Sequence, residues 1–156
     1  MMAPYITVRI FAALTRRTVD GRSAAALGLG LLFLFTGIGH FTHTEPMAQM
    51  LPPWVPARKL LVYVTGVLEF ALAIGFFVPK SRTITGWVAV GVLVVFFPVN
   101  IYAALQHIPM GGHAWGPVYL LMRAPLQVII VWWVYWFTLR PPQPPLHADV
   151  LPAAHR

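Results

Sequence analysis

The sequence has no cysteine and few charged residues of either sign. The absence of cysteine excludes disulfides, thiol–disulfide relays, iron–sulfur clusters, thiolate metal sites and cysteine nucleophiles. Charged residues make up only 10% of the 156 residues, against about 25% in soluble domains. So few charges cannot cover a water-soluble globule of this size. The sequence also lacks a serine triad, paired carboxylates and a dinucleotide or phosphate-binding fingerprint.

The sequence contains long hydrophobic runs. Hydrophobic residues make up 58% of the chain, and the mean hydropathy is +0.72. A spanning helix needs roughly 20 mostly apolar residues, and four runs qualify: residues 24–41, 60–78, 84–105 and 118–139. Prolines, which end helices, punctuate the connections. We therefore predict an all-α fold, an integral membrane four-helix up-down bundle formed by residues 24–139.

Two flanking segments complete the predicted organisation. Residues 1–23 are predicted to be a cytoplasmic segment that includes an interfacial helix, because apolar residues cluster around Arg9. Residues 140–156 are rich in proline and have little to bury, which predicts a disordered or extended cytoplasmic tail.

The basic residues predict the orientation in the membrane. The chain has 11 Lys and Arg against 4 Asp and Glu, but nearly all the basic residues flank apolar runs, so we expect no nucleic-acid partner. Only Arg58 and Lys59 fall on the side opposite the termini, and Arg123 lies within the fourth run. The positive-inside rule then places both termini in the cytoplasm. The predicted location is a bacterial-type plasma (inner) membrane, crossed several times.

Polar side chains within the apolar runs form the candidate site. Ionisable groups are costly inside a bilayer, so they usually face the bundle and have a partner. Five residues qualify: His40, Glu69, Asn100, Arg123 and Gln127. A rise of about 1.5 Å per residue places them in the outer half of the bundle. We expect Glu69 to pair with Arg123. Two interpretations stay open: a ligand or proton site, or a pair that only fixes helix register.

Four histidines form a second cluster at or beyond the predicted outer face: His40, His43, His107 and His113. Methionines are interleaved with them, and histidine with thioether ligands would suit copper more than zinc. The alternative is that these are ordinary loop and interface histidines. Because His40 and His43 share a helical face only if the helix continues past Phe41, we predict no metal site.

Five short motifs carry a family resemblance. In chain order they are residues 37–41 (GIGHF), 51–56 (LPPWVP), 66–69 (GVLE), 97–101 (FPVNI) and 123–127 (RAPLQ). Together they resemble the DoxX family of small four-helix membrane proteins, over about residues 24–137. The resemblance implies a membrane partner of redox or oxidative-stress proteins, and the family is named for a subunit linked to thiosulfate:quinone oxidoreduction.

These observations lead to three functional hypotheses. The first is a redox-associated membrane subunit whose outer-half polar pocket binds a small molecule such as quinone. In it Glu69 accepts a proton, and Arg123 holds its charge and orients the ligand. Asn100 and Gln127 supply hydrogen bonds, and His40 passes protons outward. The second is a non-catalytic scaffold that docks a redox protein or another copy of itself. The third is a small-molecule or ion carrier. No catalytic residue is assigned, no cofactor other than quinone is expected, and an accessory role is favoured over catalysis.

Overall fold

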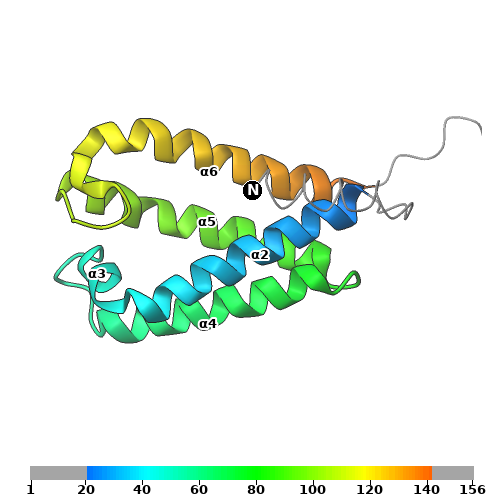
Figure 1. Ribbon diagram of the computed structural model, residues 1–156, viewed down its shortest axis with the longest axis horizontal. Helices are drawn as coiled ribbons and strands as arrows, with labels where there is room; N and C mark the ends of the chain where they lie inside the picture. The colour runs from blue at the N-terminus through cyan, green and yellow to red at the C-terminus, as the bar shows by residue number, and fades with distance from the viewer. Residues whose placement is uncertain (1–20, 142–156) are drawn as a thin grey trace, which may run out of the picture.

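Four long apolar helices run the length of the molecule (Figure 1). The computed structural model describes residues 21–141. The helices are α2 (Gly21–Thr42), α4 (Arg58–Phe77), α5 (Arg82–Leu105) and α6 (Leu120–Val134), which a π-helical turn, η2 (Tyr135–Leu139), continues. Each crossing is long and apolar enough to span a membrane, with His113–Leu139 forming the fourth. No strand occurs within residues 21–141.

The helix bounds confirm the four predicted spans. The first three begin and end within three residues of the predicted positions. The fourth is preceded by a 3-10 segment, η1 (His113–Tyr119), which is interrupted at Gly116 by φ 67° and ψ −150°. Regular α-helix follows from Leu120, close to the predicted start at residue 118. The predicted interfacial helix in residues 1–23 falls almost entirely outside the described residues, as does the proline-rich tail.

Small residues bring α2 and α4 close together. Gly37 and Gly66 face each other, and a Cβ built on Gly37 would lie 3.4 Å from the Gly66 carbonyl oxygen. A Cβ on Gly66 would lie only 2.7 Å from the Cβ of His40. Small side chains allow helix backbones to approach in this way. The two helices therefore form a tight pair.

The helices follow one another around the bundle in the order α2, α4, α5, α6. Helix α4 packs against α2 and α5, α5 packs against α6, and η2 closes the ring by packing against α2. Helices α4 and α6 consequently lie on a diagonal. This order decides which polar side chains can meet.

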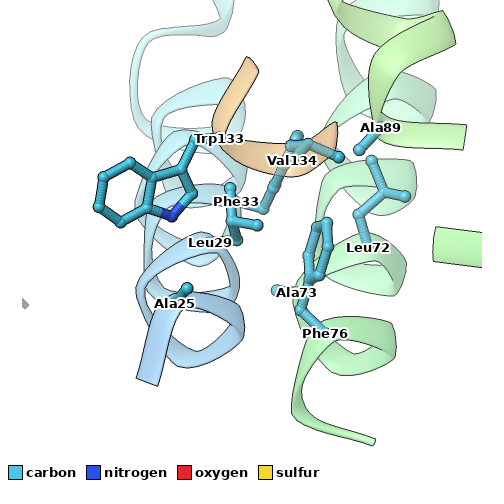
Figure 2. Packing of buried hydrophobic residues seen from close by; sticks show 9 residues of the cluster. All are labelled: Ala25, Leu29, Phe33, Leu72, Ala73, Phe76, Ala89, Trp133 and Val134. Atoms are coloured by element: carbon cyan, nitrogen blue, oxygen red, sulfur yellow. The ribbon is translucent and has the colours of Figure 1, made fainter. Parts of the chain in front are cut away.

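The hydrophobic core lies toward the end of the bundle where α2 begins and α6 ends. Figure 2 shows the cluster, which comprises Ala25, Leu29, Phe33, Leu72, Ala73, Phe76, Ala89, Trp133 and Val134. The rings of Phe33 and Phe76 stack with their centroids 5.7 Å apart. At the same end, Arg82 donates from Nε to the Phe76 carbonyl (3.1 Å) and from Nη1 to the Ser23 hydroxyl (3.0 Å). These contacts hold three helices together.

The opposite end of the bundle carries two short caps. Helix α3 (Thr44–Gln49) packs against α4, and η1 packs against α5 and α6. Each cap thus packs mainly against one of two helix pairs: α3 against the α2–α4 pair, and η1 against the α5–α6 pair. Figure 1 shows the two pairs further apart at this end than at the end that holds the core.

Candidate ligand-binding cavity

A cavity of about 390 Å³ lies between the two helix pairs, beneath α3. Every long helix contributes to its wall, and so does the α3 cap. Its lining residues are Thr36, His40, Met47, Met50, Leu51, Leu61, Val62, Thr65, Glu69, Val95, Phe96, Val99, Asn100 and Arg123. Most of these side chains are apolar, so the few polar groups among them are conspicuous. Four of the five predicted site residues line this one cavity.

Glu69 meets His40 rather than the predicted partner. The Nδ1 atom of His40 lies 3.5 Å from Oε2 of Glu69 and 3.0 Å from the carbonyl oxygen of Thr36. Both neighbours are acceptors, so Nδ1 carries the ring proton in this arrangement. The tight packing of α2 on α4 explains the contact. His40 lies about one turn after Gly37 on α2, and Glu69 lies about one turn after Gly66 on α4, so the close approach of the two glycines brings the two side chains together.

The predicted direct ion pair between Glu69 and Arg123 is wrong for this structure. Within residues 21–141, the pairs closer than 4.0 Å are His40 with Glu69 and Lys59 with Glu45. Arg123 interacts with Glu69 electrostatically but does not reach it. The physical reason is the diagonal placement of α4 and α6, with the cavity between them. The two charges face the same space from opposite walls.

Two buried polar atoms in this site have no hydrogen-bond partner. They are Oε2 of Glu69 and Nε of Arg123. Buried polar atoms in folded proteins are hydrogen-bonded in roughly nine cases out of ten, and an unmade bond to a charged group costs about 1–3 kcal/mol or more. Both residues line the same cavity, and Oε2 of Glu69 has only the 3.5 Å contact with His40.

Asn100 is held at the cavity wall by a hydrogen bond to Phe96 and a contact with His113. Its Nδ2 donates to the Phe96 carbonyl oxygen at 2.8 Å, and its Oδ1 lies 3.2 Å from Nε2 of His113. The other ring nitrogen of His113 lies 2.5 Å from the Met110 carbonyl oxygen. His113 is only 4% exposed. It therefore fastens η1 to α5 and positions Asn100, a role that the sequence interpretation did not assign to it.

Gln127 does not join the other four residues. Its Nε2 donates to the Leu93 carbonyl oxygen on α5, and its buried Oε1 has no hydrogen-bond partner. It lies instead at an apolar groove of about 670 Å³ formed by α5 and α6. The groove is lined by Trp87, Val90, Val94, Phe97, Ala124, Gln127, Val128, Val131, Trp132, Tyr135 and Leu139. We call it the α5–α6 groove.

The four histidines considered as copper ligands have separate surroundings. His40 lines the cavity, and His43 contacts the Thr42 hydroxyl. His107 packs over Gly116, and His113 contacts Asn100. Within residues 21–141, no three His, Asp or Glu side chains come together as a metal-binding group.

Comparison with known proteins places the chain in one family. No curated protein and no solved structure matches it. The resemblance to the DoxX family therefore rests on the five motifs and stays a prediction. A family model, described as a domain of unknown function (DUF8561), matches residues 29–138, which is more than half of the chain. The chain therefore belongs to the DUF8561 family.

Proposed function

We propose that this protein binds a small molecule with a hydrogen-bonding head in the cavity between its helix pairs, as a redox-associated membrane subunit. One observation carries the proposal: Glu69 and Arg123, each of which has a buried side-chain atom without a hydrogen bond, line the same apolar-walled cavity. A ligand with both an acceptor and a donor would satisfy both atoms at once. The volume lies within the range of about 300–1,000 Å³ that is usual for small-molecule sites.

The reduced form of a quinone, a quinol, fits this chemistry. One quinol hydroxyl can donate to Glu69, and the other quinol oxygen can accept from Arg123. The apolar walls suit the ring. His40, in contact with Glu69, offers a route for a proton between the carboxylate and the α3 end of the bundle. The resemblance to the DoxX family supports the same class of ligand.

The distribution of basic residues supports an orientation for this site. Arg22, Lys80, Arg82 and Arg140 gather at the end of the bundle that holds the core, whereas Arg58 and Lys59 lie at the cavity end. The positive-inside rule then places the core end in the cytoplasm of a bacterial-type plasma membrane, with the cavity in the outer leaflet. The variants Lys80→Cys and Lys59→Cys, made in a chain without native cysteine, test this orientation. On intact cells, a membrane-impermeant maleimide should label Lys59→Cys and should not label Lys80→Cys.

Binding of a decyl-tailed benzoquinone, kept in its reduced quinol form by dithionite, to the full chain in nanodiscs tests the proposed ligand. We expect Glu69→Gln and Arg123→Gln to weaken binding by roughly tenfold or more, because each removes a charged hydrogen-bonding group. Glu45→Gln is the matched control, since Glu45 pairs with Lys59 on the surface. Wild-type affinity in folded Glu69→Gln and Arg123→Gln variants would refute the proposal.

A second function, docking of a partner membrane protein, is favoured by the α5–α6 groove. The groove is apolar except at Gln127, whose Oε1 is buried without a partner. This fits a transmembrane helix that presents one hydroxyl or amide donor to Gln127. We expect Gln127→Met to release such a partner during co-purification in mild detergent, whereas Glu69→Gln retains it. A partner that co-purifies with Gln127→Met as well as with the wild type would contradict this role for the groove.

A further inference from the structure

We infer that the cavity opens sideways between α4 and α5 into the hydrocarbon of the bilayer. Its ligand would then be a single-chain amphiphile that enters from the membrane, with a compact hydrogen-bonding head inside and an apolar chain outside. This inference rests on the proposed function, because it concerns the ligand of the same cavity. It adds the route and the requirement for a long apolar chain.

The lining of the cavity divides into a buried polar floor and an exposed apolar rim. Glu69 and Asn100 are buried, and His40 and Arg123 are largely so. By contrast, Leu61 is 40% exposed and Val95 is 67% exposed. We call Leu61 and Val95 the rim residues.

The exposed rim lies on α4 and α5, which are neighbours in the bundle. The cavity residues from α2 and α6 are only partly exposed: Thr36, His40 and Arg123. Near their connecting loop, α4 and α5 are held together by the close contact of Gly75 with Thr85. Figure 1 shows them separating from this contact toward α3. The opening therefore lies between α4 and α5, on their membrane-facing side.

The chemistry of the rim matches hydrocarbon rather than water. Leu61 and Val95 are aliphatic, and the hydroxyl of Thr65 beside them is bonded to the Leu61 and Val62 carbonyl oxygens, both at 2.9 Å. At the α3 end, the cavity is covered by three apolar side chains, Met47, Met50 and Leu51. A polar ligand from water would have to pass these groups, whereas an apolar chain meets no polar group at the rim.

Two quinone probes and a matched pair of variants test the route. The probes are a decyl-tailed benzoquinone and its tail-less head, 2,3-dimethoxy-5-methyl-benzoquinone. Val95→Trp fills the rim. Val94→Trp is the control, because Val94 is also exposed (59%) but lines the α5–α6 groove instead. We expect Val95→Trp to weaken binding of the tailed probe by roughly tenfold and Val94→Trp to change it little.

Equal binding by the two variants would overturn the lateral route. So would binding of the tail-less head as tight as that of the tailed probe at equal concentration in the membrane, because that result points to access from water between the two caps. Thermal unfolding of each variant checks the fold. If Val95→Trp does not fold, Leu61→Phe with Leu60→Phe as its control repeats the comparison at the other side of the rim.

A second measurement separates failure of the route from failure of the proposed ligand. A hydrocarbon-soluble diazirine is activated by light in vesicles that hold the full chain, and its insertion at Glu69 is measured by peptide mass spectrometry. We expect insertion in wild type and Val94→Trp, and several-fold less in Val95→Trp. Insertion that depends on Val95, without binding of either quinone, supports the route and refutes quinone as the ligand. Insertion that Val95→Trp leaves unchanged refutes the route.

Discussion

Replacing Gly66 with alanine tests whether the close packing of α2 on α4 is what places His40 beside Glu69. A Cβ on Gly66 would lie 2.7 Å from the Cβ of His40 and 2.8 Å from Cε2 of Phe41. The Phe41 ring can turn away, but the His40 Cβ is fixed to the α2 backbone. Restoring an ordinary contact requires the helices to separate by roughly 0.7 Å, and steep repulsion at shorter distances enforces this.

The expected cost follows from two opposing effects. Overpacking a close contact costs about 1–3 kcal/mol, whereas alanine in place of glycine inside a helix contributes up to about 1 kcal/mol of stability. Gly91 on α5 isolates the second effect, because a Cβ there would meet nothing within 4 Å. We therefore expect Gly91→Ala to be neutral or stabilising and Gly66→Ala to be less stable than it by about 1–3 kcal/mol.

Reversible unfolding in detergent micelles, followed by tryptophan fluorescence, measures this difference. Binding of the decyl-tailed benzoquinone is measured on the same samples, and we expect Gly66→Ala to weaken it because His40 moves away from Glu69. If Gly66→Ala and Gly91→Ala shift the free energy of unfolding equally, the close approach of α2 and α4 is not what fixes His40. The explanation for the His40–Glu69 contact would then fail.

The same unfolding assay checks two further contacts. We expect His113→Leu to cost about 1–3 kcal/mol, because it removes the ring that contacts both the Met110 carbonyl oxygen and Oδ1 of Asn100. The exposed His43→Leu should stay within about 0.5 kcal/mol, and equal effects would refute the role of His113. We expect Arg82→Lys to cost about 1 kcal/mol, because a single ammonium cannot reproduce the guanidinium bonds to two helices, whereas Lys80→Arg should have little effect.

The spans were predictable because the bilayer sets their length and composition. A crossing needs a long apolar run, and the four runs in the sequence became helices with nearly the predicted bounds. The short cap helix α3 was not predicted. It contains Pro46, which at the start of a helix removes no hydrogen bond that the helix would otherwise make. The prolines in this segment indicate a break between long helices, but they do not indicate whether a short helix forms there.

The members of the site were predictable, and their partners were not. Burying Glu69, Asn100 and Arg123 in a span is costly, so their presence alone indicated an inward-facing polar site. The sequence of a single span does not indicate which helices are its neighbours in the bundle. The order around the bundle brings Glu69 to His40 and leaves Arg123 across the cavity.

Two side chains show how local geometry escaped the sequence interpretation. Gln127 lies one turn beyond Arg123, but its side chain donates to the Leu93 carbonyl oxygen and lines the α5–α6 groove instead of the cavity. His113 was assigned only to a loop. Positive φ angles at Gly111, Gly112 and Gly116 fold that loop back onto α5, and the three glycines were the signal that could have indicated such a fold.

The diagonal placement of the two charges yields a final prediction that separates a ligand site from a purely structural pair. In the ligand-free protein, a double-mutant cycle between His40→Leu and Glu69→Gln should give a coupling energy of about 0.5–3 kcal/mol, as residues in contact do. The cycle between Glu69→Gln and Arg123→Gln should give a smaller coupling energy, because these two charges interact across the cavity without contact. Coupling between Glu69 and Arg123 in binding of the decyl-tailed benzoquinone should then be larger, since one molecule contacts both. A strong Glu69–Arg123 coupling without ligand, unchanged on binding, would show that the pair serves the fold alone.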